Sequence, residues 1–376
     1  MYTKTMTRLF LAAVILAACS GNSLTQIQPG EIWPDTEGRH INAHGGGILK
    51  QGKDWWWFGE HKADSTTKAL VGVTCYRSRD LVNWKYEGVA FSVSDDPDSP
   101  ITKGCVIERP KVIRNPKTGK YAMWFHLEHK GYGYKMAHYG VAVSDNIRGP
   151  YSLVSWGRVN PGHWPANLSD EERAAIDAID LDAPVASGSP EWEEQSRIGR
   201  FLKRDIEEGQ MARDQTVYVD DDGKAYHIYC SEENMTLHIA ELSDDYLSHT
   251  GRYVRMAPGD HNEAPALFKK DGTYWMITSG CTGWNPNKAR MYSAPSILGP
   301  WTRHENPCVG PNADLTFLGQ STFIIPVPGS KANEFIFMAD IWKPKHPIDS
   351  RYIWLPISWK DGLPVIQWQD SWTPEL

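Results

Sequence analysis

The chain has 376 residues, of which 41% are hydrophobic, and a formal net charge of −7. This length suits one large domain or two to three smaller ones, and the hydrophobic content is sufficient for a proper core. The acidic balance argues against a nucleic-acid-binding surface, so no nucleic-acid partner is expected. The 17 tryptophans suit packing between sheets, and some of them suit stacking on the apolar faces of sugar rings.

The first residues have the pattern of a processing segment. A short basic region precedes the apolar run 9–16, which is too short to span a bilayer as a permanent helix. Leu16-Ala17-Ala18-Cys19 then matches a bacterial lipobox. We expect residues 1–18 to be a lipoprotein signal peptide, Cys19 to carry the lipid, and residues 19–29 to form a flexible tether. The protein would then be an exported lipoprotein, anchored at the periplasm or the cell surface. The alternative is a plain signal peptide with a chance cysteine.

Beyond residue 30, one short unit recurs five times. In each unit a polar residue precedes an apolar run, a turn rich in Gly, Pro, Asn or Asp follows, and a second apolar run comes next. The leading polar residues, in register, are His44, Glu108, Asp214, Glu263 and Gln320. Each unit continues with a further strand pair. Four short strands in units of roughly 50–60 residues predict an all-β, five-bladed β-propeller over residues 30–376.

The first strand of each blade in such a fold lines the central axis, so the five leading residues are predicted to converge on one pocket. The alternative is that these residues merely hydrogen-bond backbone groups at the blade starts, which is less consistent with four carboxylate or amide side chains in register.

A partly helical insertion, at about residues 157–213, separates the second and third units. Its capping box Ser169-Asp170-Glu171-Glu172 predicts a short helix at 173–179. A second helix is expected near 198–206. Because the insertion ends just before Asp214, it could fold over the pocket and shape it.

Five cysteines follow Cys19, and an odd number cannot all pair. One disulfide would suit an exported protein, although the spacing assigns no pair. Cys230 lies in an apolar run and is predicted to be a small buried residue. No metal-ligand spacing is present, so neither a cofactor nor a metal site is expected, with a structural cation on the propeller axis left open. The five cysteines are Cys75, Cys105, Cys230, Cys281 and Cys308.

Carboxylates that converge on an aromatic-rich pocket of an exported protein indicate glycoside hydrolysis. One carboxyl group must stay protonated to donate to the leaving oxygen, and burial beside an ionised carboxylate raises its pKa. The second group activates water or tunes the first. The sequence has no Gly-rich phosphate loop, nucleophile elbow or zinc motif. Gly45-Gly46-Gly47 precedes a strand, which favours close backbone packing near the axis.

The chain resembles glycoside hydrolase family 43, whose members are five-bladed propellers that hydrolyse glycosidic bonds with inversion. The resemblance extends from about residue 30 to 373, apart from the insertion, and is closest to the exo-β-1,3-galactanase branch. Its motifs include Ala43-His44-Gly45-Gly46-Gly47-Ile48, Trp57-Phe58-Gly59-Glu60, Glu108-Arg109-Pro110-Lys111-Val112, Glu263-Ala264-Pro265 and Ser279-Gly280-Cys281-Thr282-Gly283-Trp284.

The resemblance implies that Glu263 is the general acid and that Asp214 orients it and raises its pKa. Most of the family has a catalytic-base Asp at the start of the first blade, where this chain has His44-Gly45. In the galactanase branch a glutamine, here Gln320, is proposed to act as base in its imidic-acid form, and Glu108 is the competing candidate. The sugar contacts that the resemblance and the pocket imply are Glu108, Glu60, His44, Tyr132, Trp124, Thr282 and Trp284.

We therefore expect an exo-acting, inverting glycoside hydrolase that releases galactose from the β-1,3-linked galactan of arabinogalactan-type glycans. One alternative is an α-L-arabinofuranosidase or a β-D-galactofuranosidase of the same fold. Another is a non-catalytic glycan-binding lipoprotein, because the usual base is missing. The expected partners are a β-galactan or arabinogalactan oligosaccharide and, through the lipid anchor alone, a membrane. A monomer is expected.

Overall fold

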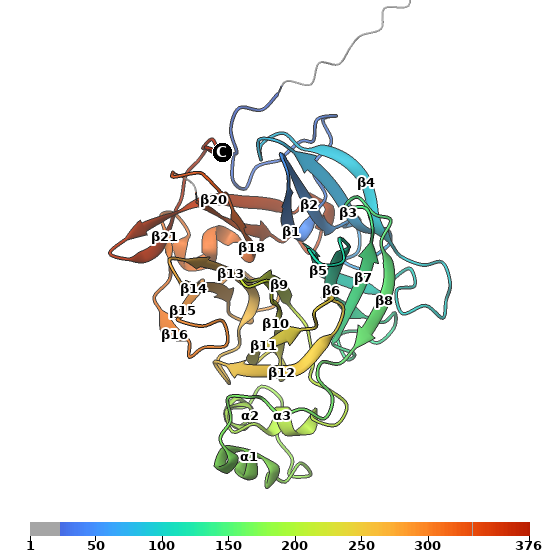
Figure 1. Ribbon diagram of the computed structural model, residues 1–376, viewed down its shortest axis with the longest axis vertical. Helices are drawn as coiled ribbons and strands as arrows, with labels where there is room; N and C mark the ends of the chain where they lie inside the picture. Colours follow the sequence, from blue (N-terminus) through green and yellow to red (C-terminus); the bar gives the residue numbers. More distant parts are fainter. Residues whose placement is uncertain (1–22, 333) are drawn as a thin grey trace, which may run out of the picture.

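The computed structural model describes residues 23–332 and 334–376, and in it five sheets of short strands surround one central axis (Figure 1). This arrangement confirms the predicted five-bladed β-propeller. The predicted signal peptide and the lipid-bearing Cys19 lie outside the described residues.

The first four blades are four-stranded antiparallel meanders whose first strand lies innermost. Blade one comprises β1 (His44–Gln51), β2 (Asp54–Glu60), β3 (Gly72–Ser78) and β4 (Lys85–Ser92). Blade two comprises β5 (Val106–Arg114), β6 (Tyr121–Glu128), β7 (His138–Ser144) and β8 (Ser152–Gly157). Blade three comprises β9 (Gln215–Val219), β10 (Ala225–Ser231), β11 (Thr236–Leu242) and β12 (His249–Met256). Blade four comprises β13 (Glu263–Lys270), β14 (Thr273–Ser279), β15 (Arg290–Ala294) and β16 (Thr302–His304).

Blade five has an additional short strand. Its sheet order is β17-β21-β20-β19-β18, and β17 pairs with β21 in parallel. These strands are β17 (Cys308–Val309), β18 (Gln320–Pro326), β19 (Phe335–Ile341), β20 (Arg351–Lys360) and β21 (Leu363–Gln367), with the 3₁₀ helices η1 (Ala313–Leu318) and η2 (Pro347–Asp349) in its connections.

Local sequence explains the tight hairpins. Asp271 and Gly272 both have left-handed backbone angles between the paired residues Lys270 and Thr273. Two such central residues match the right-handed twist of the flanking strands, which is why Asp-Gly favours a two-residue hairpin. The turn that the repeat predicts between the two apolar runs of each unit is therefore present between β13 and β14.

The two ends of the chain close the ring between blades five and one. Ile27 and Trp372 exchange two backbone hydrogen bonds of 2.8 and 3.0 Å. Further upstream, the backbone N–H of Leu24 donates to Asn83 of blade one at 2.8 Å. The described part of the segment predicted as a flexible tether thus packs on the propeller from Leu24 onward.

The insertion forms α1 (Asp170–Asp177), α2 (Pro190–Arg197) and α3 (Arg200–Arg204). Ser169 and Glu172 make the predicted capping box, although α1 begins earlier than expected. The helix expected near 198–206 is the shorter α3, which begins after Gly199 in a left-handed conformation, and α2 is a further helix that precedes the expected range.

The helices lie outside β12, away from the axis, and not over the pocket (Figure 1). Burial of apolar side chains explains this position, since Ile176 and Leu202 pack with Tyr229 and Tyr253 of blade three.

The five cysteines of the described residues are all free, so the disulfide that the sequence allowed does not form among them. Cys230 is buried, as predicted. In residues 23–332 and 334–376, no helix has the length and apolar character needed to cross a bilayer. The same part of the chain holds no cluster of three His, Cys, Asp or Glu residues suited to a metal ion.

Candidate active site

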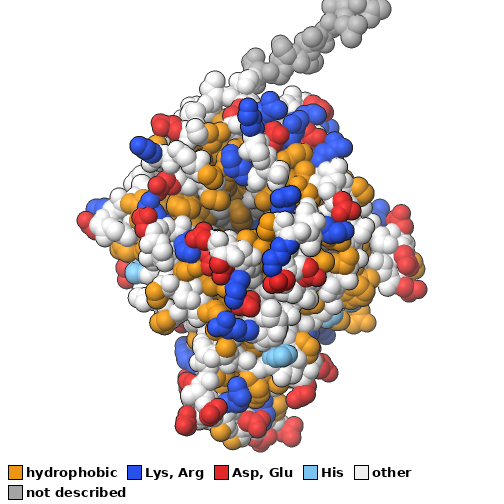
Figure 2. Space-filling view, in the orientation of Figure 1, with side chains coloured by type: hydrophobic (Ala, Val, Ile, Leu, Met, Phe, Trp, Pro, Cys, Tyr) orange, Lys and Arg blue, Asp and Glu red, His pale blue; other side chains and the backbone are white. Residues whose placement is uncertain are grey.

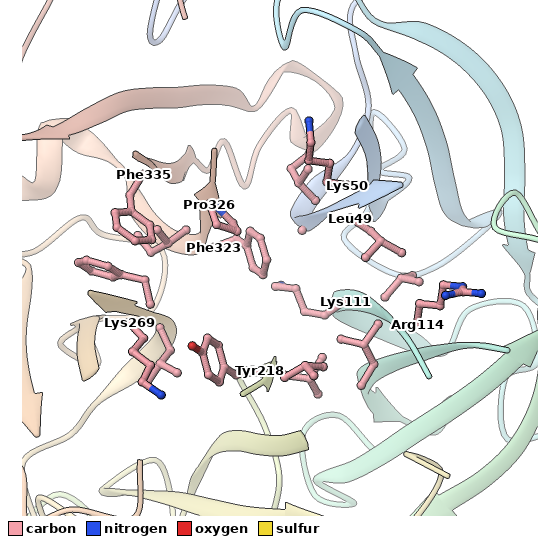
Figure 3. Close-up of a pocket in the computed structure, with 18 of the residues that line it drawn as sticks. Leu49, Lys50, Lys111, Arg114, Tyr218, Lys269, Phe323, Pro326 and Phe335 are labelled. Carbon is pink, nitrogen blue, oxygen red and sulfur yellow. The ribbon is translucent and has the colours of Figure 1, made fainter. Parts of the chain in front are cut away.

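A cavity lies at each end of the propeller axis. The larger, of about 860 Å³, is lined mainly by the distal halves of the innermost strands, and Phe323, Phe335 and Tyr218 are among the side chains that surround it (Figure 3). It is the hollow with hydrophobic walls at the centre of the face in Figure 2. The carboxylates in its lining, Asp221 and Asp271, are exposed turn residues, so this end offers no buried acid.

The smaller cavity, of about 340 Å³, lies at the other end of the axis, where the innermost strands begin. Four of the five leading residues line it: Glu108, Asp214, Glu263 and Gln320. They come from four different blades, so the repeat places them together as predicted. The rest of the lining comprises Glu60, Thr67, Arg109, His126, Tyr134, Arg213, Asn234, Gly283, Trp284 and Trp342.

A repeated backbone feature presents three of the leading residues. The residue after each of His44, Glu108 and Glu263 has a positive φ, namely Gly45 (59°), Arg109 (55°) and Ala264 (54°). Each lies in a register irregularity of its innermost strand. Such bulges bend a strand and redirect its side chains, and non-glycine residues adopt this conformation only where the surroundings enforce it. The blade starts are therefore built to orient side chains at the axis.

Glu263 lines this cavity with a carboxyl group whose proton affinity suits acid catalysis. Its Oε1 accepts hydrogen bonds from Asn234 Nδ2 at 2.9 Å and from Cys281 Sγ at 3.0 Å. Burial, followed by the negative charge of Asp214, raises the pKa of Glu263 to about 7. Glu263 therefore retains a proton to near-neutral pH.

Arg109 links the other groups. Its Nη2 lies 2.9 Å from Oδ2 of Asp214 and donates to Oε1 of Gln320 at 2.5 Å, while its Nη1 donates to the Ser321 carbonyl at 2.8 Å. Burial opposes its charge, but nearby carboxylates, Asp214 first, hold the pKa of Arg109 above its ordinary value. A permanent cation thus stands between Asp214 and Gln320.

The Gln320 amide has partners at both ends. Its Oε1 accepts from Arg109, and its Nε2 donates to Ser279 Oγ at 2.8 Å and to Glu263 Oε2 at 3.4 Å. The guanidinium at Oε1 and the hydroxyl at Nε2 together set the orientation of the amide. Gln320 is therefore held between the cation and the acid.

Glu108 is an ionised carboxylate. Its Oε2 lies 3.1 Å from His126 Nδ1, and its Oε1 accepts from the Tyr134 hydroxyl at 2.6 Å. Burial would raise the pKa of Glu108, but the hydrogen bond and charge of His126 lower it to about 2. The carboxylate is thus a strong hydrogen-bond acceptor and a weak base.

A layer of buried charges supports the site from below. The Glu60 carboxylate accepts from the Arg109 backbone N–H at 2.9 Å and pairs with Lys62. The Lys111 ammonium donates to the Gly45 carbonyl at 2.7 Å, and burial lowers the pKa of Lys111 to about 7. This layer fixes the backbone around Arg109 and separates the two cavities.

The structure does not bring four of the predicted sugar contacts to this cavity. His44 is fully buried, with its ring stacked on Tyr352 at 5.3 Å between centroids. Trp124 is also fully buried, and its indole N–H donates to the Tyr246 carbonyl at 3.0 Å. Burial of both rings in the packing between strands leaves no surface for a sugar.

The other two lie in loops beside the cavity. Tyr132 is 56% exposed and lines a separate surface hollow. The Thr282 hydroxyl is engaged by its own loop, donating to the Asn285 carbonyl at 2.6 Å. By contrast, Glu60 and Trp284 line the cavity as expected, and Trp284 has 43% of its surface exposed.

Several lining residues were not singled out from the sequence. Arg109 lay inside a motif that was noted for Glu108, and His126 faces Glu108 as its cross-strand partner, a relationship that the strand pairing could have indicated. Tyr134, Asn234 and Trp342 lie outside the strands, where no periodic pattern marks them.

Comparison with known proteins agrees with this site. Residues 187–364 match the model of glycosyl hydrolases family 43. The chain is similar to a solved family-43 β-1,3-galactosidase in complex with galactodeoxynojirimycin, with 56% identity, a TM-score of 0.89, and coverage of 92% of this chain and 100% of that one. It is also similar to the exo-β-1,3-galactanase of Phanerochaete chrysosporium solved with β-1,3-galactotriose, with 31% identity, a TM-score of 0.74, and coverage of 94% and 69%.

Among curated proteins, the β-D-galactofuranosidase xynD of Aspergillus niger is 27% identical over 122 residues. That match covers 32% of this chain and about a third, 35%, of the length of the relative.

Proposed function

The chain belongs to glycosyl hydrolase family 43, and from this premise we propose that it is an exo-acting, inverting enzyme that releases galactose from the β-1,3-linked galactan of arabinogalactan-type glycans. The observation that supports this choice of substrate is the 56% identity with a family-43 β-1,3-galactosidase, over an alignment that covers 100% of that protein's chain. The acid site agrees with the reaction class, because inverting glycosidases need one protonated carboxyl group and one group that activates water.

Glu263 is the general acid in this proposal. Its pKa of about 7 lets it carry a proton at the pH where it must donate one to the leaving oxygen. Asp214 contributes by its negative charge, and it forms a 2.9 Å ion pair with Arg109.

Gln320 is the group to which we assign water activation, with Glu108 as an acceptor for a sugar hydroxyl. An ordinary amide nitrogen is not basic, so this role requires the imidic-acid tautomer, in which Oε1 carries a proton. Oε1 accepts from Arg109 in the structure, and a hydroxyl at Oε1 keeps a lone pair for that contact. The proton moves to Oε1 from Nε2, which then has one N–H group left for Ser279 and Glu263 and a lone pair that can take a proton from water. The low pKa of Glu108 favours the assignment, since Glu108 is a weak base.

Release of sugar from a small panel of substrates tests the proposal. β-1,3-Galactobiose should be cleaved to galactose, and aryl α-L-arabinofuranosides and β-D-galactofuranosides should be cleaved far more slowly. The partial similarity to a β-D-galactofuranosidase makes the furanoside the second candidate. Preferred cleavage of a furanoside would replace the galactan assignment, whereas binding of galactobiose without cleavage would favour the non-catalytic glycan-binding lipoprotein.

We also propose that a lipid on Cys19 anchors the protein with the active site facing away from the membrane. Leu24 bonds to Asn83, in the turn after β3, and the end of β3 pairs with Trp55, which lines the larger cavity. The chain thus leaves the propeller at the end opposite the active site. Five residues from Cys19 to Leu24 reach at most about 18 Å.

Replacement of Cys19 tests the lipid anchor. The Cys19→Ala variant should appear in the soluble fraction with unchanged turnover, and a variant that stays in the membrane fraction would contradict the anchor.

A further inference from the structure

A buried chain of three side chains leads away from the candidate active site within blade two. His126 Nδ1 lies 3.1 Å from Glu108 Oε2, and its Nε2 lies 3.0 Å from Glu128 Oε1. Glu108 and His126 are cross-strand partners of β5 and β6, and Glu128 follows His126 by two residues on the same face of β6. His126 and Glu128 are 1% and 0% exposed, so water does not reach the contact between them, while the Glu108 side chain is 13% exposed at the cavity.

This geometry fixes the charge of His126. A neutral imidazole has one N–H and one lone pair, whereas an imidazolium donates from both nitrogens. Each ring nitrogen of His126 faces a carboxylate oxygen, so a neutral ring would direct a lone pair at a negative charge. Burial opposes the charged form, but hydrogen bonds to Glu108 and Glu128 raise the pKa of His126 to about 9. The ring is therefore an imidazolium at neutral pH.

Glu128 also holds the loop that carries Tyr134. Its Oε2 accepts from the Met136 backbone N–H at 2.8 Å, and its Oε1 accepts from the Ala137 backbone N–H at 3.0 Å. Tyr134, two residues before Met136, donates its hydroxyl to Glu108 Oε1 at 2.6 Å. Both oxygens of Glu108 thus have donors, and both donors depend on Glu128.

We propose that His126 and Glu128 are positioning residues that keep Glu108 as an oriented, ionised acceptor for a substrate hydroxyl and prevent it from acting as the water-activating base. This inference rests on the proposed galactosidase function. A carboxylate that accepts from an imidazolium and a phenol gains little from taking a proton, because protonation would weaken both hydrogen bonds. The same contacts stabilise its interaction with a neutral sugar hydroxyl.

Other charged groups face this chain from neighbouring elements and set the baseline for any pH effect. Lys62, after β2, faces Glu108 and favours its ionised form. His129 and His138 lie near Glu128, and burial lowers the pKa of both, so these rings are neutral at pH 7, where His126 is charged. Among Glu108, His126 and Glu128, His126 is therefore the cation at neutral pH.

The Michaelis parameters of His126→Asn test the proposal, with His138→Asn as the matched control in the adjacent strand. Loss of the charged donor should raise KM for β-1,3-galactobiose by about 10-fold or more, with a much smaller change in kcat. The KM of the variant should rise further as the pH falls below about 5, because the pKa of Glu108 returns toward its ordinary value of about 4.3. Wild type and His138→Asn should show no such rise.

A fall in kcat at unchanged KM, with a shifted acid limb of kcat, would overturn the proposal and make Glu108 the base. Unchanged KM at every pH would overturn it as well. Glu128→Gln supplies a second variant. It should also raise KM with little change in kcat, but the rise in KM should be smaller than in His126→Asn. Thermal unfolding of each variant checks that it folds.

The charge of His126 can also be measured without substrate. Ring-nitrogen correlation spectra of the wild-type protein, with the His126→Asn spectrum to identify the signal, should show an imidazolium at pH 7 that titrates well above pH 8. A neutral His126 ring at pH 7 would overturn the inference even if neither variant folds. Because this measurement needs no turnover, failure of the wild type to release galactose would refute the proposed function and leave this test intact.

Discussion

A Cβ atom built on Gly45 would lie 2.2 Å from Oε1 of Glu60, far inside van der Waals contact. The Glu60 carboxylate, reaching in from the end of β2, therefore occupies the space that a side chain at the start of blade one would need. It does not substitute for that side chain as a base, because it is buried and paired with Lys62 and the Arg109 backbone. The first blade thus supports Arg109 instead of presenting a catalytic carboxylate.

Gly45→Asp is expected to destabilise the protein without creating a new base. Gly52 also has a positive φ but has no neighbour within 4 Å of a built Cβ, so Gly52→Asp is the matched control for backbone strain. Overpacking should lower the free energy of unfolding of Gly45→Asp by about 1–3 kcal/mol more than that of the control. Denaturant unfolding measures this difference. Equal stability of the two variants would show that Glu60 does not fill the space that a side chain at position 45 needs.

Asp214→Asn should shift the pH profile of the enzyme. Glu263 must be protonated to act as an acid, so activity should fall as the pH rises through its pKa of about 7. Removing the charge of Asp214 removes one of the causes that raise this pKa, so the alkaline limb of kcat/KM should move to lower pH. An alkaline limb of kcat/KM that is unchanged by Asp214→Asn would contradict the coupling between Asp214 and Glu263.

Glu263→Gln should lower kcat by about 10²-fold or more, because it removes the general acid. The exposed Glu207→Gln serves as its control.

Gln320→Ala and Glu108→Ala should have different kinetic effects. The first should lower kcat by at least about 10²-fold with little change in substrate binding, because it removes water activation. The second should raise KM, since a sugar hydroxyl loses a charge-assisted acceptor. Rescue of Glu108→Ala by azide, with a glycosyl azide as product and wild-type turnover in Gln320→Ala, would transfer the role of base to Glu108.

Because of Glu232, the free energy of unfolding should fall as the pH is lowered from about 4.3 toward 2. It is fully buried and accepts from Arg255 Nε and Nη2, both at 2.7 Å, and from His238 Nε2 at 2.9 Å. Burial would raise its pKa, but Arg255 lowers it to about 2. A lowered pKa contributes stability above the unfolded value of about 4.3, and this stability is lost as the pH falls toward 2.

Replacement of Glu232 by Gln leaves the buried Arg255 unpaired and should cost about 3–5 kcal/mol at pH 7. The control is Glu241→Gln, which breaks pairs with the exposed Arg252 and Lys224 and should cost at most about 1 kcal/mol. Urea unfolding at pH 7 and pH 3 should show a smaller difference between wild type and Glu232→Gln at the lower pH. An equal difference at both would contradict the low pKa.

The propeller and four of the five axial residues were predictable because the unit repeats in register. Periodic spacing determines which strand is innermost, and that geometry brings Glu108, Asp214, Glu263 and Gln320 together. His44 has the same register but a different surrounding: its ring packs on Tyr352, which no local pattern indicates.

Residues outside the strands were harder to predict. Tyr134 and Asn234 reach the site through loop conformations that depend on tertiary contacts, such as the bonds from Met136 and Ala137 to Glu128. Trp124 was misplaced because every residue of β6 is buried, so alternation could not separate the pocket face from the core face. The insertion carried an identifiable capping box, but its position depends on apolar packing against blade three.

The anomer that is released first from β-1,3-galactobiose tests the central claim most directly. Proton NMR during the first minutes of hydrolysis distinguishes the two anomers of galactose before they equilibrate. An inverting enzyme with Glu263 as acid and water attacking from the opposite face predicts that α-galactose appears first, and that Glu263→Gln produces almost none of it. Initial release of β-galactose, or no release of galactose at all by the wild-type protein, would contradict the account.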